Sequence, residues 1–298
     1  MENKYPTLSI ITPAYNRGNL LRECFQSLNS QTEMDFEWIV VDDGSTDNTE
    51  EIMGQIAEAE KAFPVTYVKK ENGGKHTALN ASHPYIRGKY VLILDSDDIL
   101  KEAAVETVLQ NWRKYENDSE IGMLIFLKEN EQHVLCAYAK DEYKPVDLLN
   151  YKRTSVMSSD CCEVLRAEWF KEYPFPVFAG ERFLAETALW YRVGLNTKCI
   201  YINKVIYICQ YMEGGLTKSG RSMRIRNPQG GKYTSYLRMN RHCRIKERIR
   251  AGLLFICYGY FAGEKTGKLL AEAKPYGALT LLCLLPGKLM YALWRKRY

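Results

Sequence analysis

The sequence lacks the short signatures of common metal and redox centres. Its nine cysteines contain no C-x-x-C pair, and its four histidines have no metal-ligand spacing. The number of cysteines is odd, and the adjacent pair Cys161 and Cys162 suits neither a zinc knuckle nor an ordinary disulfide. We therefore expect reduced, mostly buried thiols in a cytosolic protein.

Other familiar signatures are missing as well. No G-x-G-x-x-G or G-x-S-x-G occurs, so nothing indicates a dinucleotide-binding turn or a hydrolase nucleophile. The segment Met1–Pro13 has no cationic region followed by an apolar core, as a secretory signal would. The longest uncharged stretches near the C-terminus, 251–263 and 275–287, have 13 residues each, whereas a spanning helix needs about 20. We expect a chain that does not cross a bilayer.

The chain has enough apolar residues for a large core and an uneven distribution of charge. It has 298 residues, of which 46% are hydrophobic and 26% charged, and its formal net charge is +5. Between Lys218 and Arg250 there are eleven Lys or Arg and one acid, a local charge of +10, so the remaining residues sum to −5. This pattern favours an anionic ligand or membrane surface over a protein that coats DNA.

The first 115 residues alternate between short apolar runs and amphipathic segments. The pattern predicts strands at 8–12, 36–41, 65–69 and 90–94. It predicts helices that begin near Asn19 and Asp47 and that span 77–85 and 101–115, with the second ending near residue 62. Strands separated by helices indicate βαβ units and a mainly parallel sheet, hence an α/β fold.

Polar clusters follow the ends of these predicted strands. They are Tyr15-Asn16-Arg17, Asp42-Asp43, Asn72-Gly73-Gly74-Lys75 and Asp95-Ser96-Asp97-Asp98. Ligands of open α/β sheets bind beyond the carboxyl ends of the strands, so these clusters should meet at one rim. Asp and Gly also terminate strands for purely structural reasons.

The acidic tripeptide Asp95-Ser96-Asp97 directly follows the apolar run Tyr90–Leu94. Carboxylates two residues apart just past a strand can converge on a hard divalent cation that takes its other ligands from phosphates. Such an ion stabilises a diphosphate as a leaving group. We expect a metal site here. For His76, beside the glycines, a surface or structural role is favoured over a contact with a ligand.

In combination, four motifs resemble the successive signatures of inverting family-2 glycosyltransferases, which have the GT-A fold and use nucleotide-activated sugars. They are IITPAYNR (10–17), VVDDGSTD (40–47), NGGK (72–75) with ALN (78–80), and LDSDD (94–98). The resemblance is dense over residues 5–115 and thinner to about residue 217. It implies a GT-A domain over 1–217, with a nucleotide-sugar half over 1–115 and an acceptor half over 116–217.

The resemblance also assigns residues to the donor. It places Pro13, Ala14 and Tyr15 along the nucleoside, with Tyr15 near the base, although Tyr15 could instead pack in the core. Asp43 would accept a hydrogen bond from the imide N–H of a base such as uracil, and Lys75 would stand near the nucleotide or sugar.

At the acidic segment, Asp95 and Ser96 would contact ribose or donor sugar, and Asp97 would bind the cation, Mn²⁺ or Mg²⁺. In the second half, Ile121–Leu127, His133–Tyr138 and Cys161–Leu165 are predicted to be strands.

The segment Gly180–Val193 resembles the family helix that carries the catalytic base near its start. Glu186 is the preferred base, because Leu189, Trp190 and Arg192 follow it at the family spacing. The rival is Glu181, which directly follows a glycine and suits the first turn of a helix, where an acid is also favoured for structural reasons.

Residues 218–298 form a predicted basic and amphipathic helical extension. Gly214–Thr217 and the following basic stretch could form a flap, with Lys218 or Arg221 meeting the diphosphate, or simply a solvated basic face. The apolar runs near 253–256 and 279–285, flanked by Lys and Arg, favour helices that lie in the headgroup region of an anionic membrane. The alternative is a helical pair packed on the catalytic domain.

The sequence thus predicts a metal-dependent inverting glycosyltransferase that moves one sugar from a nucleotide-sugar, by family habit a UDP-sugar, to a glycan or lipid-linked glycan. It would work in the cytoplasm, at the inner face of the membrane. No Q-x-x-R-W occurs, so a processive synthase is not expected. Two alternatives stay open, namely a non-catalytic nucleotide-sugar-binding homologue and, more distantly, a nucleic-acid-binding protein.

Overall fold

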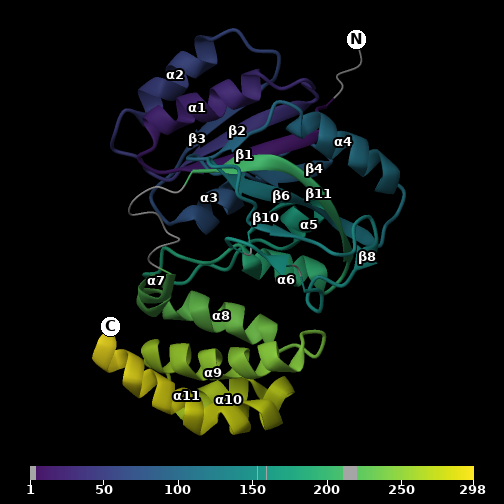
Figure 1. Cartoon of the computed structure of the whole chain (residues 1–298). Helices are drawn as coiled ribbons and strands as arrows, with labels where there is room; N and C mark the ends of the chain where they lie inside the picture. The colour runs from purple at the N-terminus through teal and green to yellow at the C-terminus, as the bar shows by residue number, and fades with distance from the viewer. Residues whose placement is uncertain (1–4, 153, 159, 211–219) are drawn as a thin grey trace. The chain divides into compact units, whose positions relative to one another are not determined.

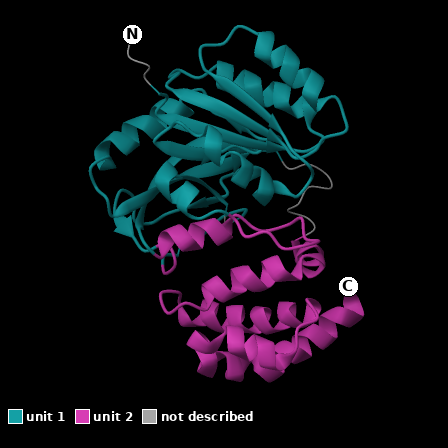
Figure 2. Ribbon diagram, turned by 180° about the vertical axis from the view of Figure 1, so that it is seen from behind, with its two compact units in different colours: residues 1–147, 151–174, 196–212 teal, residues 148–150, 175–195, 213–298 magenta. Residues whose placement is uncertain are grey.

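A computed structural model describes residues 5–152, 154–158, 160–210 and 220–298. The chain divides into two compact units, each of which is described by itself (Figure 2). Unit 1 comprises residues 1–147, 151–174 and 196–212, and unit 2 comprises residues 148–150, 175–195 and 213–298. Unit 2 therefore includes residues 175–195, and with them Glu186, besides the C-terminal region.

Unit 1 is built on a mixed, mainly parallel sheet with nine strands among the described residues. The strands are β1 (Leu8–Ala14), β2 (Phe36–Asp42), β3 (Val65–Lys69), β4 (Tyr90–Ile93), β5 (Ile99–Leu100), β6 (Ile121–Asn130), β8 (Pro145–Val146), β10 (Cys161–Arg166) and β11 (Lys198–Cys209). Their order is β3-β2-β1-β4-β10-β6-β11-β5, with β8 paired to β11. Within this order β3, β2, β1 and β4 are parallel, whereas β10 runs antiparallel to β4 and β6. A separate ladder pairs β7 (Ala137–Tyr138) with β9 (Thr154–Ser155).

Helices cover both faces of this sheet (Figure 1). They are α1 (Gly18–Asn29), α2 (Thr49–Glu58), α3 (Lys75–Ala81), α4 (Ala104–Tyr115) and α5 (Ala167–Glu172). Alternate residues of the central strands, such as Leu8, Ile10 and Trp38, point into one core with apolar residues of α1, α2 and α4. Side chains alternate between the two faces of a strand, and because helices cover both faces, every residue of β1, β2 and β4 is buried. The predicted α/β fold with a mainly parallel sheet is confirmed.

Several predicted helix boundaries were wrong. Asn19 does not cap α1, which begins at Gly18, and the Gly18 N–H instead donates to the Asp47 carboxylate at 3.3 Å. Helix α2 ends at Glu58, not near residue 62, because Ala59 is already extended with ψ 150°. The segment predicted as one helix over 77–85 is α3 followed by a 3-10 turn at His83–Tyr85, where proline lacks the N–H that would continue the helix.

Unit 2 is helical. Its helices are α6 (Thr187–Gly194), α7 (Gly220–Arg226), α8 (Pro228–Arg238), α9 (Ile245–Phe261), α10 (Thr266–Glu272) and α11 (Gly277–Arg297). Helices α9 and α11 approach closely at Gly287, where a Cβ would lie 2.8 Å from the Cβ of Ile256. The buried ammonium of Lys232 donates to Glu264 at 2.7 Å and to Glu272 at 2.8 Å, which ties α8 to α10 and the turn before it. The predicted C-terminal helical region is therefore present.

All nine cysteines are free and buried, as expected. The last helix is longer than the uncharged stretches of 13 residues. The segment Lys274–Arg297 has 24 residues, and its most apolar 18-residue window has a mean hydropathy of 1.4, enough by length and composition to cross a membrane. The uncharged stretch 275–287 ends before Lys288, but α11 continues through this lysine to Arg297. Only 17% of that window is buried in the structure.

Candidate active site

The predicted polar clusters belong to neighbouring parallel strands. In the order β3-β2-β1-β4, Lys70 follows β3, Asp43 follows β2, Tyr15 follows β1 and Leu94-Asp95 follow β4. The carboxyl ends of parallel strands lie at the same edge of a sheet, so these residues share one rim. Hydrogen bonds link the clusters, since the N–H of Asp43 donates to the carbonyl of Ala14 at 2.8 Å.

Asp43 is buried and ties two loops of the rim together. Its Oδ1 accepts hydrogen bonds from the Lys70 ammonium at 2.7 Å and the Gly73 N–H at 3.0 Å, and its Oδ2 accepts the Gly74 N–H at 2.6 Å. Gly74 has a φ of +93°, which a residue with a side chain rarely adopts. Among the described residues Oδ2 accepts this one hydrogen bond, so it retains acceptor capacity for a further donor.

A shallow, open hollow of about 640 Å³ adjoins Asp43, lined by Gly44, Ser45, Lys69, Lys70, Glu71 and Asn72. Tyr15, at the end of β1, is 46% exposed, so the alternative that it packs in the core was wrong. Pro13 and Ala14 are buried within β1. The next residue, Asn16, has a φ of +52° and accepts the Thr46 N–H at 2.8 Å, which locks the Tyr15 turn to the Asp43 turn.

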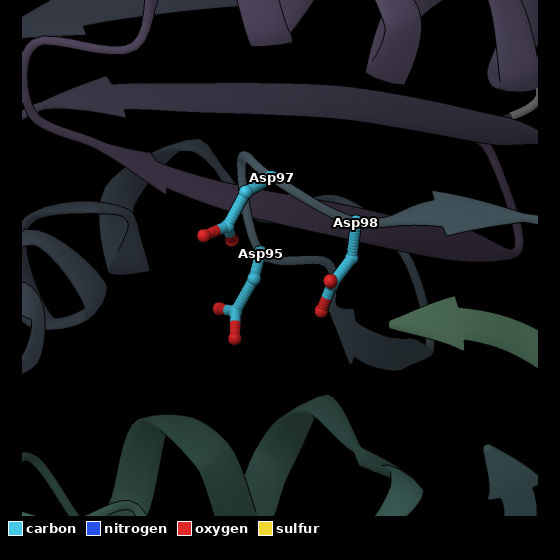
Figure 3. A group of neighbouring side chains, drawn as sticks. All are labelled: Asp95, Asp97 and Asp98. Atoms are coloured by element: carbon cyan, nitrogen blue, oxygen red, sulfur yellow. The ribbon is translucent and has the colours of Figure 1, made fainter. Parts of the chain in front are cut away.

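The acidic segment forms a tight turn after β4, closed by a hydrogen bond from the Asp98 N–H to the Asp95 carbonyl at 3.0 Å. Asp95, Asp97 and Asp98 each offer a carboxylate oxygen, and these atoms lie within 4.8 Å of one another. Figure 3 shows the three side chains leaving this acidic loop, residues 95–98, toward the same side. Ser96, which lies between Asp95 and Asp97 in the sequence, is buried.

Strand β11 holds the acidic loop in place. The hydroxyl of Tyr207 accepts the Asp95 N–H at 2.9 Å and hydrogen-bonds the Asp98 side chain. The Gln210 N–H donates to Asp98 Oδ1 at 2.8 Å. Asp98 is therefore committed to the protein, whereas the half-buried Asp97 has no side-chain partner among the described residues and is the carboxylate most available to a ligand.

Cations offset the crowding of these carboxylates. The Lys75 ammonium forms an ion pair with Asp95, and Lys128 of β6 adds a second positive charge. Burial opposes ionisation of Asp95, but the two lysines lower the pKa of Asp95 below its ordinary value. Burial, together with Asp95, raises the pKa of Asp98 to about 7 and raises the pKa of Asp97 as well.

This donor set fits a hard divalent cation. Carboxylate oxygens of Asp95, Asp97 and Asp98 lie within 4.8 Å of one another, and oxygen atoms of this kind are the ligands that Mg²⁺ and Mn²⁺ prefer. Lys75, at the start of α3, lies at the same place and could turn toward an anionic ligand, since its side chain is partly exposed. Thus the structure brings Asp43, Lys75, Asp95, Ser96 and Asp97 to one rim of unit 1.

Glu186 and Glu181 both lie in unit 2. Helix α6 begins at Thr187, so Glu186 takes the N-cap position, and its carbonyl accepts the Leu189 N–H at 2.8 Å. Glu181 lies before that helix, so its predicted place in the first turn was wrong. Its carboxylate instead accepts the N–H groups of Gln229 at 2.7 Å and Gly230 at 2.8 Å, in the first turn of α8. That position gives Glu181 a structural role.

The proposed flap residues receive little support for a role at the diphosphate. Gly214–Thr217 and Lys218 lie outside the described residues. The Arg221 guanidinium lies 4.6 Å from the centroid of the Trp294 ring and donates to the Tyr298 hydroxyl at 3.4 Å, within unit 2. His76 is buried beside Asp43 and Lys70, as a structural role predicts.

Sequence reasoning missed three residues of the rim, namely Lys70, Lys128 and Tyr207. Lys70 could have been found, because it directly follows the predicted strand 65–69 and lies beside the glycine loop. Tyr207 is 112 positions after Asp95, and both Tyr207 and Lys128 lie inside long strands whose mostly apolar sequences indicate only burial. No local motif reports their pairing.

The comparisons with known proteins agree with this geometry. The sequence profile described as "Glycosyl transferase family 2" matches residues 9–173. Glycosyltransferase GlyA of Streptococcus pneumoniae is 32% identical over 223 residues, which cover 71% of this chain and 31% of GlyA. Glycosyltransferase GlyG of the same organism is 27% identical over 71% of this chain and 73% of GlyG. The chain thus spans about a third of the length of GlyA.

Solved structures share the fold at low identity. TarS 1–349 of S. aureus in complex with UDP-GlcNAc superposes with a TM-score of 0.62 and 19% identity, over 97% of this chain and 92% of that chain. The mannosyltransferase PcManGT of Pyrobaculum calidifontis, in complex with GDP-Man and Mn²⁺, has a TM-score of 0.55 and 19% identity over 99% and 89%. These likenesses confirm the predicted GT-A fold.

We predict that Glu181→Gln lowers the free energy of unfolding by about 1–2 kcal/mol, because an NH₂ group, which cannot accept a hydrogen bond, replaces one of the two carboxylate oxygens that cap α8. Glu60→Gln makes the same chemical change at an exposed acid of unit 1 and is the control, which should change stability by less than about 0.5 kcal/mol. Urea unfolding followed by circular dichroism measures both. Equal losses would contradict the capping role of Glu181.

Proposed function

The chain belongs to glycosyl transferase family 2, and from this premise we propose that it is a nucleotide-sugar-dependent glycosyltransferase that adds one sugar with inversion at the anomeric carbon. The acidic loop carries this proposal: three carboxylates meet at the rim where the fold presents its ligand, beside a lysine and an exposed tyrosine. A non-catalytic homologue would keep the rim without turnover, and a nucleic-acid-binding protein would leave the acidic loop unexplained.

The donor would bind along the ends of β1, β2 and β4. The exposed Tyr15 ring would lie against the base, with the buried Pro13 and Ala14 forming the floor. The Oδ2 atom of Asp43 would accept the imide N–H of uracil in addition to the Gly74 N–H. TarS in complex with UDP-GlcNAc, which has the same fold, supports a UDP-sugar as the donor.

Asp97 would be the principal metal ligand, and Asp95 and Ser96 would contact the ribose or donor sugar. A bound Mn²⁺ or Mg²⁺ would neutralise the diphosphate and so stabilise it as the leaving group. Lys75 would add its positive charge to the diphosphate after leaving Asp95. PcManGT in complex with GDP-Man and Mn²⁺, which has the same fold, supports a metal here.

Glu186 would serve as the general base. In a single displacement the acceptor hydroxyl attacks the anomeric carbon from the face opposite the nucleotide and loses its proton as the new bond forms. We prefer Glu186 over Glu181 because Glu186 stands at the start of α6, where the family resemblance puts the base, whereas the Glu181 carboxylate caps α8 by accepting two backbone N–H groups. The acceptor would be a glycan or lipid-linked glycan, and the absence of Q-x-x-R-W from the sequence favours single additions.

Helix α11 supports a peripheral contact with an anionic membrane on the cytoplasmic side. Its outward residues are leucines that are 59–77% exposed, namely Leu281, Leu282, Leu285, Leu289 and Leu293. Its opposite face, with Thr280, Cys283 and Gly287, is buried. Arg295, Lys296 and Arg297 follow at its C-terminal end. An apolar stripe with cations at one end fits the headgroup region of anionic lipid.

Asp97→Asn should reduce sugar transfer at least ~10²-fold while the fold persists, because the change keeps the size of the side chain but removes the charge that holds the cation. Transfer is measured with a panel of nucleotide-sugars and Mn²⁺. In the wild type, a donor at 100 times its Kd should also stabilise the protein by about 2.7 kcal/mol in thermal unfolding. Full activity of the variant, or of the wild type in excess EDTA, would remove the metal from the mechanism.

Glu186→Gln should bind nucleotide-sugar almost normally, since the base contacts the acceptor and not the diphosphate. Its turnover should fall ~10²–10⁴-fold, the usual share of general base catalysis. Titration calorimetry and the transfer assay separate the two effects. Glu181→Gln, compared at a temperature where it is folded, should retain most of its turnover. If the order is reversed, Glu181 carries the proton, and if neither variant loses activity, Asp98 and Asp160 are tested next.

The triple variant L281Q/L285Q/L289Q should release the protein from phosphatidylglycerol vesicles by at least ~10-fold in a flotation assay, because about 0.8 kcal/mol is lost for each buried CH₂ group. The matched control replaces three exposed apolar residues of unit 1, in V134Q/V156Q/M157Q, and should bind vesicles like the wild type. Unchanged binding of the α11 variant would overturn the membrane proposal. Resistance of the wild type to alkaline carbonate extraction would instead show a spanning helix.

A further inference from the structure

A lysine that has no part in the proposed mechanism lies against the acidic loop. Lys128 of β6 is paired in register with Tyr207 of β11, and its ammonium lies 3.7 Å from the centroid of the Tyr207 ring. The hydroxyl of that same tyrosine accepts the Asp95 N–H at 2.9 Å and hydrogen-bonds Asp98. One aromatic side chain therefore holds both the acidic loop and a cation next to it.

Lys128 is charged and oriented toward the loop by these contacts. Burial by itself would favour the neutral amine, but the carboxylates of Asp95 and Asp98 and other groups keep the pKa of Lys128 above its ordinary value. Its charge acts on both of those aspartates. A divalent cation bound to the same carboxylates would be repelled by this ammonium.

The two lysines at the loop differ in their freedom. Lys75 lies at the partly exposed start of α3 and pairs directly with Asp95, so it can turn toward an incoming anion. Lys128 is fixed on a central strand under the ring of Tyr207 and cannot follow. Its positive charge therefore remains beside the carboxylates whatever binds at the rim.

We propose that Lys128 is a positioning residue that weakens the binding of a divalent cation to the acidic loop until the donor diphosphate is present. Without the diphosphate, the cation meets three carboxylates and a fixed ammonium. With it, the added negative charges offset that ammonium, so cation and donor strengthen each other's binding. This inference rests on the metal-dependent part of the proposed function, and it assigns a role to a residue outside the donor and acceptor contacts.

The test is a titration of the full chain with Mn²⁺, followed by the electron paramagnetic resonance signal of free Mn²⁺, with and without UDP. Lys128→Met keeps the length of the side chain and removes the charge, so it should bind Mn²⁺ alone at least ~10-fold more tightly than the wild type. Lys128→Arg keeps the charge and should stay within ~3-fold of the wild type. The gain in Mn²⁺ affinity on adding UDP should be smaller for Lys128→Met than for the wild type.

The direction of the change separates charge from structure, because damage to the loop can only weaken binding. Equal or weaker binding by Lys128→Met, in a variant whose circular dichroism matches the wild type, overturns the inference. If that variant does not fold, Lys128→Gln is held to the same result. If the wild type binds Mn²⁺ and the Lys128 variants bind it equally well, the inference about Lys128 is overturned but the metal-dependent function is not. Absence of Mn²⁺ binding in every protein, with and without UDP, overturns the metal-dependent function as well.

Discussion

Electrostatic repulsion among the carboxylates after β4 is the constraint on which the rim is built. Three acidic oxygens lie within 4.8 Å of one another, and without compensation their charges would open the loop or take up protons. Lys75 pairs with one of them, Lys128 adds a buried charge, and Tyr207 and the Gln210 N–H hold the loop to β11. The second half of unit 1 thus supports a loop that belongs to the first half. For this reason β6 and β11 are part of the site even though neither is adjacent to the acidic motif in the sequence.

The carboxylate of Asp43, in the neighbouring turn, is likewise surrounded by an ammonium and by N–H groups. Its carboxylate holds Lys70 and the N–H groups of Gly73 and Gly74, and this fixes the loop that presents Lys75. A change in that carboxylate would therefore alter both the hollow beside Asp43 and the position of Lys75. The segment 70–75 thus links the two acidic clusters of the rim. Asp43 fixes the loop that carries Lys75, and the Lys75 ammonium pairs with Asp95.

The sequence predicts those residues of the site that belong to a short motif directly after a predicted strand. Asp43, Lys75, Asp95 and Asp97 each follow a strand that periodicity reveals, so both the sheet and its rim were predictable. Glu181 shows the limit: a residue after a glycine has the character of a helix cap, yet the helix it caps starts at Pro228. Lys128 and Tyr207 show it again, since pairing between distant strands depends on the register of the whole sheet. Tertiary contacts decided these roles, and no local pattern encodes them.

Unit 2 poses a different physical problem, which is the exposed side of α11. Burying a leucine in an apolar environment is worth roughly 1.5–3 kcal/mol, and this helix leaves five of them 59–77% exposed. Its other apolar residues, among them Leu279, Tyr291 and Trp294, pack against residues of α9. The membrane contact proposed above would cover this apolar stripe. The cations at the end of the helix, together with the local charge of +10 over 218–250, would then favour a lipid surface that is anionic.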